Sequence, residues 1–277
     1  MSDADFIREV EELYQRIAEA HTDNFVELAQ IAGLDIKTDL VGADLRNVNL
    51  GGVDLREANL TGTNLRGANL RGANLSETDL SWSFLIEVNL SGANLRVANL
   101  SWANLGWANL SEANLSGANL SWANLSEADL KNTQIDEKTV IADKWRLVWE
   151  IVNIQQNNRR LTSVDLGYAN LRNSCLVDAN LRNSCLMEAN LIGADLTGAI
   201  LTYANLTDAD LSGSNLEQAD LIRANLIGVS FNNAIVRGAR FGYNTGMSRA
   251  LQQDLIARGA IFEDAPPGDR SGVLAPV

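Results

Sequence analysis

The sequence predicts an all-β solenoid in which the chain winds around a square cross-section. Leucine occupies every fifth position over 40–130 and again over 161–226. Two residues before each leucine stands a small or β-branched residue, most often alanine, and asparagine or aspartate usually comes directly before it. A slower period of twenty residues is superimposed, because Trp82, Trp102 and Trp122 recur at that spacing.

A five-residue period fits neither an α-helix nor a straight strand. Five residues advance a helix by about 500°, so successive leucines would share no face. In a strand, an odd spacing would send them to alternate sides. All leucines point inward only if the chain turns a corner in every unit, and twenty residues then make four sides. Asparagine and aspartate are expected at the corners, where their side chains bond nearby backbone and form amide ladders between coils.

The leucines are predicted to fill the core, with alanine beside them because a square interior has no room for two rows of large side chains. Each buried leucine contributes about 2 kcal/mol of transfer free energy before entropy is subtracted. Core positions predicted in this way include Leu85, Leu100, Leu105, Leu120, Leu181 and Leu201.

Segments outside the repeats are expected to cover the ends of the coils, which otherwise expose backbone and core. Residues 1–37 read as an N-terminal helical cap of two helices, of which the second begins at Thr22 or Asp23 and ends at Gly33. The first repeat block is 38–135 and the second is 161–243.

The C-terminal segment 244–277 is read as a second helical cap followed by a mobile tail. A helix is expected over 248–258, ended by Gly259, and residues 260–262 are expected to lie against the last coil. The tail holds all three prolines.

Residues 136–160 interrupt the repeats and shift their phase by one residue. The stretch ADKWRLVWEIVNIQ is predicted to be helical, with apolar residues on two sides. This helical insert either folds back on the solenoid or is an exposed docking helix for another protein.

The Ala-(Asn/Asp)-Leu-x-x unit resembles that of the pentapeptide repeat family, over both blocks. The resemblance implies a right-handed quadrilateral β-helix, and the handedness comes from the resemblance alone. The segments FVELAQIAGLDIKTDL, KWRLVWEIVN and LIARGAIFEDAPPGDRS are similar to those of cyanobacterial members.

A tryptophan column is the main candidate for a binding surface. Trp82, Trp102 and Trp122 occupy one outward position of successive coils, and Trp107 lies on the next side. The column either binds a protein partner or is covered by the insert or an edge loop, with Trp145 and Trp149 packing on it. Phe84 stands where asparagine is expected and is predicted to pack against a cap or the insert.

Few other residues are candidates for catalysis, metal binding or disulfide formation. Cys175 and Cys185 lie half a coil apart, so they should point outward on opposite sides and form no disulfide. His21 is the single histidine, and we expect for it no catalytic or metal-binding role. The sequence has no Ser/His/Asp set, no glycine-rich phosphate loop and no metal-ligand spacing, so we expect no enzyme, no metal and no cofactor.

Net charge and composition limit the kinds of partner that the sequence allows. The formal net charge of −13 disfavours nucleic acid. The N-terminus shows no secretory signal and no apolar run approaches about 18 residues, so we expect a cytoplasmic protein without membrane contact. Two capped ends favour a monomer.

We therefore expect a non-catalytic structural or protein-interaction module with an unknown protein partner. The resemblance also allows an acidic DNA mimic that acts on a DNA-binding protein such as gyrase, but arginines such as Arg46, Arg66, Arg71 and Arg96 interleave with the acidic residues. A regulatory role in cyanobacterial cell differentiation is a further alternative from resemblance, and no particular residue supports it.

Overall fold

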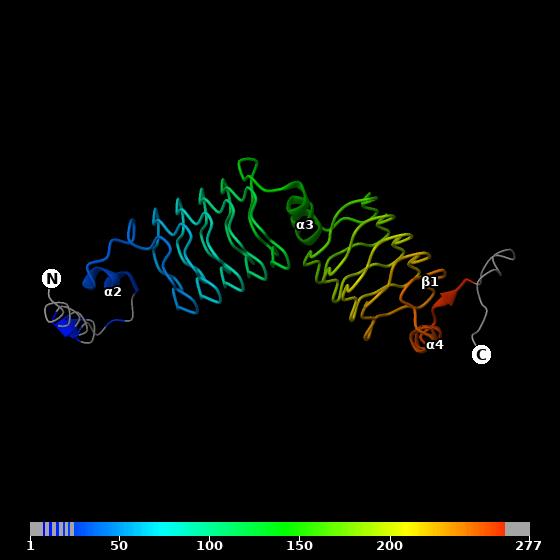
Figure 1. Ribbon diagram of the computed structural model, residues 1–277. Coiled ribbons are helices and arrows are strands. Elements are labelled where there is room, and N and C mark those ends of the chain that lie inside the picture. Colours follow the sequence, from blue (N-terminus) through cyan, green and yellow to red (C-terminus); the bar gives the residue numbers. More distant parts are fainter. Residues whose placement is uncertain are drawn as a thin grey trace. The chain divides into compact units, whose positions relative to one another are not determined.

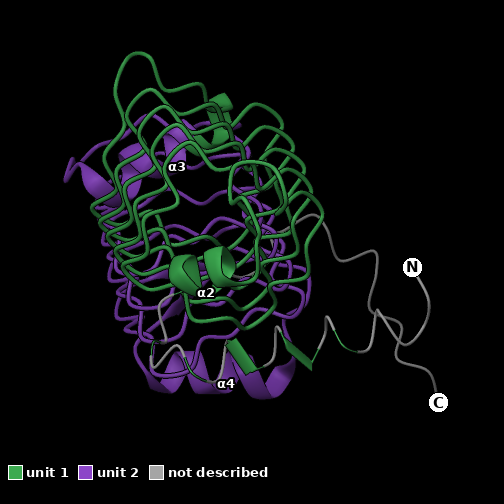
Figure 2. Ribbon diagram, turned by 90° about the vertical axis from the view of Figure 1, so that its left-hand side faces the viewer, with its two compact units in different colours: residues 1–145 green, residues 146–277 purple. Residues whose placement is uncertain are grey.

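The computed structural model describes residues 25–263 together with Arg8, Glu11, Glu12, Gln15, Arg16, Glu19 and Thr22. The chain divides into two compact units, residues 1–145 and 146–277, and coils stacked on one another make up most of each (Figures 1 and 2). The described helices and strands are α2 (Phe25–Ile31), α3 (Asp143–Asn153), β1 (Arg240–Phe241), α4 (Arg249–Ala257) and β2 (Ile261–Phe262).

Parallel backbone bridges hold the coils together. Nearly every bridge joins the residue before a core position to its equivalent twenty residues later, beginning with Asp44 and Asn64 in unit 1 and with Arg160 and Asn180 in unit 2. One bridge occurs every five residues, so each coil has four sides, as the twenty-residue period predicts. Figure 2 views the coils nearly end-on.

Leucine and alanine line the interior of both units. The predicted core residues are all at most 1% exposed: Leu85, Leu100, Leu105, Leu120, Leu181 and Leu201. Where threonine replaces alanine, its hydroxyl stays paired inside, as in Thr63, whose Oγ1 donates to the carbonyl oxygen of Leu40 at 2.9 Å. A hydrogen-bonded hydroxyl avoids the cost of burying an unpaired polar group, so the interior tolerates it.

The corners lie two residues further along the chain than the sequence analysis expects. The carbonyl of Leu45 accepts from the N–H of Val48 at 3.3 Å, and Asn47 between them has φ of 59°. This is the arrangement of a type II turn, so the corner consists of the two residues after each leucine. Asparagine and aspartate instead occupy the bridge position, which lies on a side of the square. The backbone is extended there, as bridging requires.

These bridge residues do bond the nearby backbone, as predicted. Asn49 Oδ1, for example, accepts from the N–H of Gly51, the first corner residue, at 3.3 Å. Amide ladders between coils are also present, since Asn69 Nδ2 donates to Asn49 Oδ1 at 2.7 Å and Asn94 Nδ2 donates to Asn74 Oδ1 at 3.0 Å. The side chain therefore stabilises both the turn that follows it and the stacking of coils.

The phase shift between the repeat blocks begins at Asp136. Asn119 bridges Val140, twenty-one residues later, so this coil contains one additional residue. The Asp136 carboxylate accepts hydrogen bonds at the corner of this longer coil. Its Oδ1 accepts from the N–H groups of Gly117, Lys138 and Thr139 at 2.9–3.0 Å. These hydrogen bonds, with that from Gly117 the largest cause, hold the pKa of Asp136 below its usual range.

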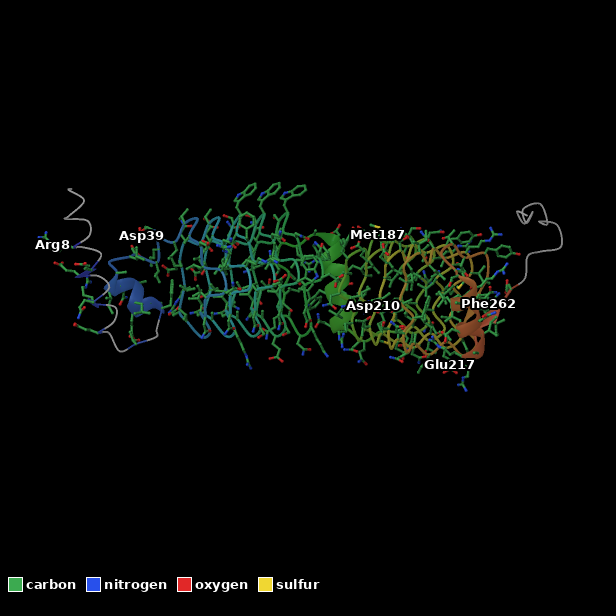
Figure 3. The ribbon with its side chains drawn as sticks, turned by 60° about the horizontal axis from the view of Figure 1, so that its bottom comes forward. Arg8, Asp39, Met187, Asp210, Glu217 and Phe262 are labelled. Atoms are coloured by element: carbon green, nitrogen blue, oxygen red, sulfur yellow. The ribbon has the colours of Figure 1, made fainter. Side chains whose placement is uncertain are left out.

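The C-terminal segment lies against the last coil of unit 2. Helix α4 lies within the segment 248–258 expected to be helical, and its N-cap Ser248 accepts from the N–H of Leu251 at 3.1 Å. Strand β2 pairs in parallel with β1. The ring of Phe262, which is labelled in Figure 3, stacks on that of Phe241 with centroids 5.2 Å apart. The prediction that residues 260–262 contact the last coil is confirmed.

The N-terminal segment is described in part. Helix α2 is followed by Gly33 with φ of 77°, as expected for a helix that ends at glycine. The first predicted helix lies largely outside the described residues, as does the proline-containing tail after Glu263. In the described part of the chain, no helix has both the length and the apolar character needed to cross a membrane.

Candidate protein-interaction face

Three tryptophans form a stacked column on one corner of unit 1. The rings of Trp82 and Trp102 lie 4.9 Å apart with planes inclined by 2°, and those of Trp102 and Trp122 lie 5.4 Å apart with planes inclined by 15°. Their exposed fractions are 58%, 48% and 75%. The column is therefore a surface feature, although each ring is large enough to favour burial.

The backbone of this column adopts a conformation that favours glycine. Each tryptophan is the second corner residue, and its φ is 61° or 62°. The equivalent positions in the two preceding coils are Gly42 and Gly62, and nothing lies within 4 Å of a Cβ built on either. A left-handed conformation costs a residue with a side chain roughly 1 kcal/mol or more relative to glycine, and corner residues outside the column, such as Glu57 and Val97, bear the same cost.

Phe84 and Trp107 extend the apolar surface across the adjoining side of the square. Phe84 takes the bridge position between Asn64 and Asn104 and is 52% exposed. Phe84 is therefore not buried, and its packing against a cap or the insert stays a prediction. Trp107 stands at the following corner and is 62% exposed. We call Trp82, Phe84, Trp102, Trp107 and Trp122 together the aromatic face.

The two tryptophans of the insert do not share this exposure. Trp145 is buried at 8% exposure on α3, with Lys144 Nζ 4.9 Å from its ring centroid. Trp149 is half-buried on the same helix. The inclusion of Trp145 in an exposed binding surface is corrected, because an amphipathic helix turns its aromatic side chains inward. Sequence periodicity alone did not distinguish a buried from an exposed tryptophan.

The aromatic coils are acidic. Residues 76–130 contain six acidic residues and one arginine, whereas residues 38–75 contain four of each. In the first coils the charges neutralise one another, as in the pairs Arg46–Asp44 at 2.6 Å and Arg56–Asp54 at 2.8 Å. The negative potential is consequently concentrated in the part of unit 1 that bears the aromatic face.

A hollow of about 840 Å³ lies between α2 and the first coils, and it is a weaker candidate. Its charged groups pair with one another: Lys37 Nζ lies 2.8 Å from Glu57 Oε2, and Arg56 Nη2 lies 2.8 Å from Asp54 Oδ2. Among the residues that the structure describes, Lys37 and Arg56 are the two cations that line the hollow. Because each is paired with a carboxylate, neither is left unpaired to bind an anion.

The remaining candidate residues show no reactive arrangement. Cys175 and Cys185 are both free, as predicted, and Cys175 Sγ lies 3.3 Å from Asn157 Oδ1. Among the described residues, no three of His, Cys, Asp and Glu are grouped to hold a metal ion. His21 lies outside the described residues.

A second exposed column was missed in the sequence analysis. Tyr203, Arg223 and Tyr243 occupy the second corner position in three successive coils of unit 2. The same twenty-residue period that identified the tryptophans identifies these residues, but alternation between tyrosine and arginine concealed the repeat.

Comparison with known proteins defines the family. The family model described as pentapeptide repeats matches 38–76, 73–111, 103–137, 161–202 and 204–242. No curated protein matches the chain.

Solved structures with detectable similarity include HetL, a pentapeptide repeat protein involved in heterocyst differentiation regulation from the cyanobacterium Nostoc sp. strain PCC 7120. It is 32% identical, with 77% of this chain and 94% of HetL covered and a TM-score of 0.31. A pentapeptide repeat protein of the Arabidopsis thaliana thylakoid lumen is 29% identical over 41% of this chain and 74% of its own, with a TM-score of 0.35.

The plasmid-mediated fluoroquinolone resistance protein QnrB1 is 17% identical, with 81% of this chain and 92% of QnrB1 covered and a TM-score of 0.24. The repeat matches extend over more than half of the sequence. The chain therefore belongs to the pentapeptide repeat family, which implies a right-handed β-helix.

Proposed function

We propose that this protein is a non-catalytic protein-interaction module and that the aromatic face of unit 1 is its docking site. The observation that carries the proposal is the exposed stack of Trp82, Trp102 and Trp122 at left-handed backbone positions. Other corner residues such as Glu57 and Val97 share this backbone conformation, so the stacking and exposure of the three rings distinguish the column. Exposed aromatic clusters on a rigid scaffold are typical of protein-binding surfaces.

The partner's chemistry follows from the charge beside the rings. Indole faces attract guanidinium and ammonium groups, by about 0.5–1 kcal/mol at exposed sites. The acidic residues of 76–130 add long-range attraction for the same groups. The surface thus fits a basic polypeptide segment that also carries apolar side chains, which would contact Phe84 and Trp107.

The other candidate functions have less support. A DNA mimic needs a continuous negative surface, but ion pairs such as Arg66–Glu87 at 3.2 Å and Arg240–Asp220 at 3.0 Å neutralise carboxylates in both units. Failure to inhibit gyrase supercoiling at high protein concentration would exclude mimicry. No residue of this chain indicates a role in cell differentiation of the kind named for HetL.

We also propose that α2 and α4 cap the ends of the coils. In α4, Leu255 is fully buried, and Arg258 Nη2 donates to the carbonyl of Phe231 at 3.0 Å. Helix α2 contributes Val26, Glu27 and Gln30 to the wall of the hollow beside the first coils. These contacts support the proposal that the two helices cover the open ends of backbone ladders.

Binding of defined peptides tests the docking proposal. A labelled peptide of alternating arginine and leucine, and a matched peptide with glutamate in place of arginine, are titrated with the full chain and followed by fluorescence anisotropy. We expect saturable binding of the arginine peptide and a loss of about tenfold in affinity for Trp102→Gly/Trp122→Gly, which corresponds to one or two cation–π contacts.

Val97→Gly is the matched control for these variants. Val97 occupies the same corner position in another column, with φ of 60° and 57% exposure, so the change removes an exposed apolar side chain without touching the aromatic face. Unchanged affinity of the double tryptophan variant, or an equal loss in Val97→Gly, would contradict the proposal. Since all variants retain the charge of the parent, non-specific electrostatic attraction stays constant.

A further inference from the structure

An alternating column of arginine and tyrosine follows one corner of unit 2. Arg182 Cζ lies 5.3 Å from the ring centroid of Tyr203, and Arg223 Cζ lies 5.5 Å from Tyr203 and 5.3 Å from Tyr243. Both arginines are exposed, and the tyrosines are 45% and 40% exposed. We call these four residues the arginine–tyrosine column.

Carboxylates neutralise some arginines of unit 2 but neither arginine of the column. Arg237 pairs with Glu217, and Arg240 pairs with Asp220 at 3.0 Å. Within residues 25–263, neither Arg182 nor Arg223 has a carboxylate oxygen at ion-pair distance. The column is thus a local concentration of positive charge in a chain whose net charge is −13.

Stacking against the tyrosine rings also orients the N–H donors of the arginine side chains. The tyrosine rings approach Arg223 from the preceding and the following coil, which favours a guanidinium plane parallel to the rings. The N–H groups then lie at the edge of the stack, where a carboxylate or phosphate accepts two parallel hydrogen bonds. Arg182 and Arg223 are two coils apart, or roughly 10 Å at the usual strand spacing, so the column presents two such forks in a row.

We propose that the arginine–tyrosine column is a second docking site, for an acidic polypeptide segment whose carboxylates pair with Arg182 and Arg223. Apolar side chains of the segment contact the exposed parts of Tyr203 and Tyr243. Charge complementarity favours this partner over a nucleic acid. Nucleic-acid binding requires many phosphate contacts, whereas residues 146–263 carry eleven acidic residues against ten arginines and would repel an extended polyanion.

The peptide of alternating glutamate and leucine, called here the glutamate–leucine peptide, is the probe for this site. Anisotropy titrations with the full chain at low and at moderate salt should show saturable binding that weakens as salt rises. We expect Arg223→Gln to reduce the affinity about tenfold, the scale of one charge-assisted pair. Arg223→Lys should lose most of the same affinity, because an ammonium group keeps the charge but lacks the planar fork.

Arg172→Gln is the matched control, because Arg172 is an exposed arginine at the first position of another corner in unit 2. It removes the same charge from the same unit and should leave the affinity unchanged. Absence of binding at low salt, an equal loss in Arg172→Gln, or unchanged affinity in Arg223→Gln would each overturn the proposal. Tighter binding of a single-stranded oligonucleotide, lost in Arg223→Gln, would overturn the choice of partner.

This test is independent of the aromatic face of unit 1. Trp102→Gly/Trp122→Gly should bind the glutamate–leucine peptide as the parent does, and Arg223→Gln should bind the arginine–leucine peptide as the parent does. Failure of one proposal is thereby distinguished from failure of the other.

Discussion

Trp102 stacks on Trp82 with ring centroids 4.9 Å apart, although both residues hold φ near 61°. The two facts oppose each other energetically. Aromatic stacking contributes about 0.5–1.5 kcal/mol per pair beyond area burial, while the left-handed backbone costs roughly 1 kcal/mol or more per residue. The column is therefore near balance, and its members can be substituted without loss of the fold.

Comparison of Trp102→Gly with Trp122→Gly isolates one stacking contact. Each change relieves the same backbone strain, but Trp102 has two ring neighbours and Trp122 has one. We expect Trp102→Gly to lower the free energy of unfolding by about 1 kcal/mol more than Trp122→Gly does, as measured by urea denaturation. Val97→Gly, which has no ring neighbour in the column, should be neutral or stabilising. Equal values for the two tryptophan variants would show that stacking contributes nothing.

The interior should be far less tolerant. Leu100 is fully buried, and Leu100→Ala is expected to cost about 2–5 kcal/mol, the usual range for removing a core leucine. Leu100→Asp should prevent folding, because it places an unpaired charge in a narrow apolar interior. Arg96→Ala, on the exposed surface of the same coil, should change the free energy of unfolding by less than about 0.5 kcal/mol. Circular dichroism and urea denaturation measure all three.

The repeat itself predicted the square coil because every fifth residue is a leucine that must point inward, and that requirement leaves few backbone paths. The position of the corner was not predictable from the preference of asparagine for turns. Asn49 bonds the turn from the preceding side, so composition alone could not separate the two positions. The exposure of a side chain was harder still to predict from the sequence. Trp102 and Trp145 have the same side chain, yet one lies on a corner and the other on the inner side of a helix.

Stability should depend on pH through Asp136. Its folded pKa is lowered, so the ionised form stabilises the fold above the unfolded pKa of about 4, and this contribution is lost as pH decreases through the folded pKa. Asp136→Asn keeps one acceptor oxygen and removes the charge. The difference in the free energy of unfolding between parent and variant should stay constant above about pH 5 and narrow below it. A difference that widens at low pH would contradict this assignment.

The C-terminal cap should depend on Arg258. Its Nη2 donates to the carbonyls of Phe231 and Ala234, and its Nη1 donates to Asp254 Oδ2 at 2.6 Å, so one guanidinium joins α4 to the last coil. Arg258→Ala leaves two partly buried carbonyls without this donor, at a cost of about 1–3 kcal/mol.

Hydrogen exchange separates detachment of the cap from general destabilisation. The amide of Ile261 donates to Ala239 O at 2.8 Å and reports on the pairing of β2 with β1. In Arg258→Ala this amide should exchange faster, while amides in the middle of unit 2, such as Leu201, keep their protection because their coils are unaffected. Arg249→Ala removes an exposed arginine from the same helix and should change neither. Equal acceleration at Leu201 and Ile261 would mean that α4 stabilises the whole unit and does not act locally as a cap.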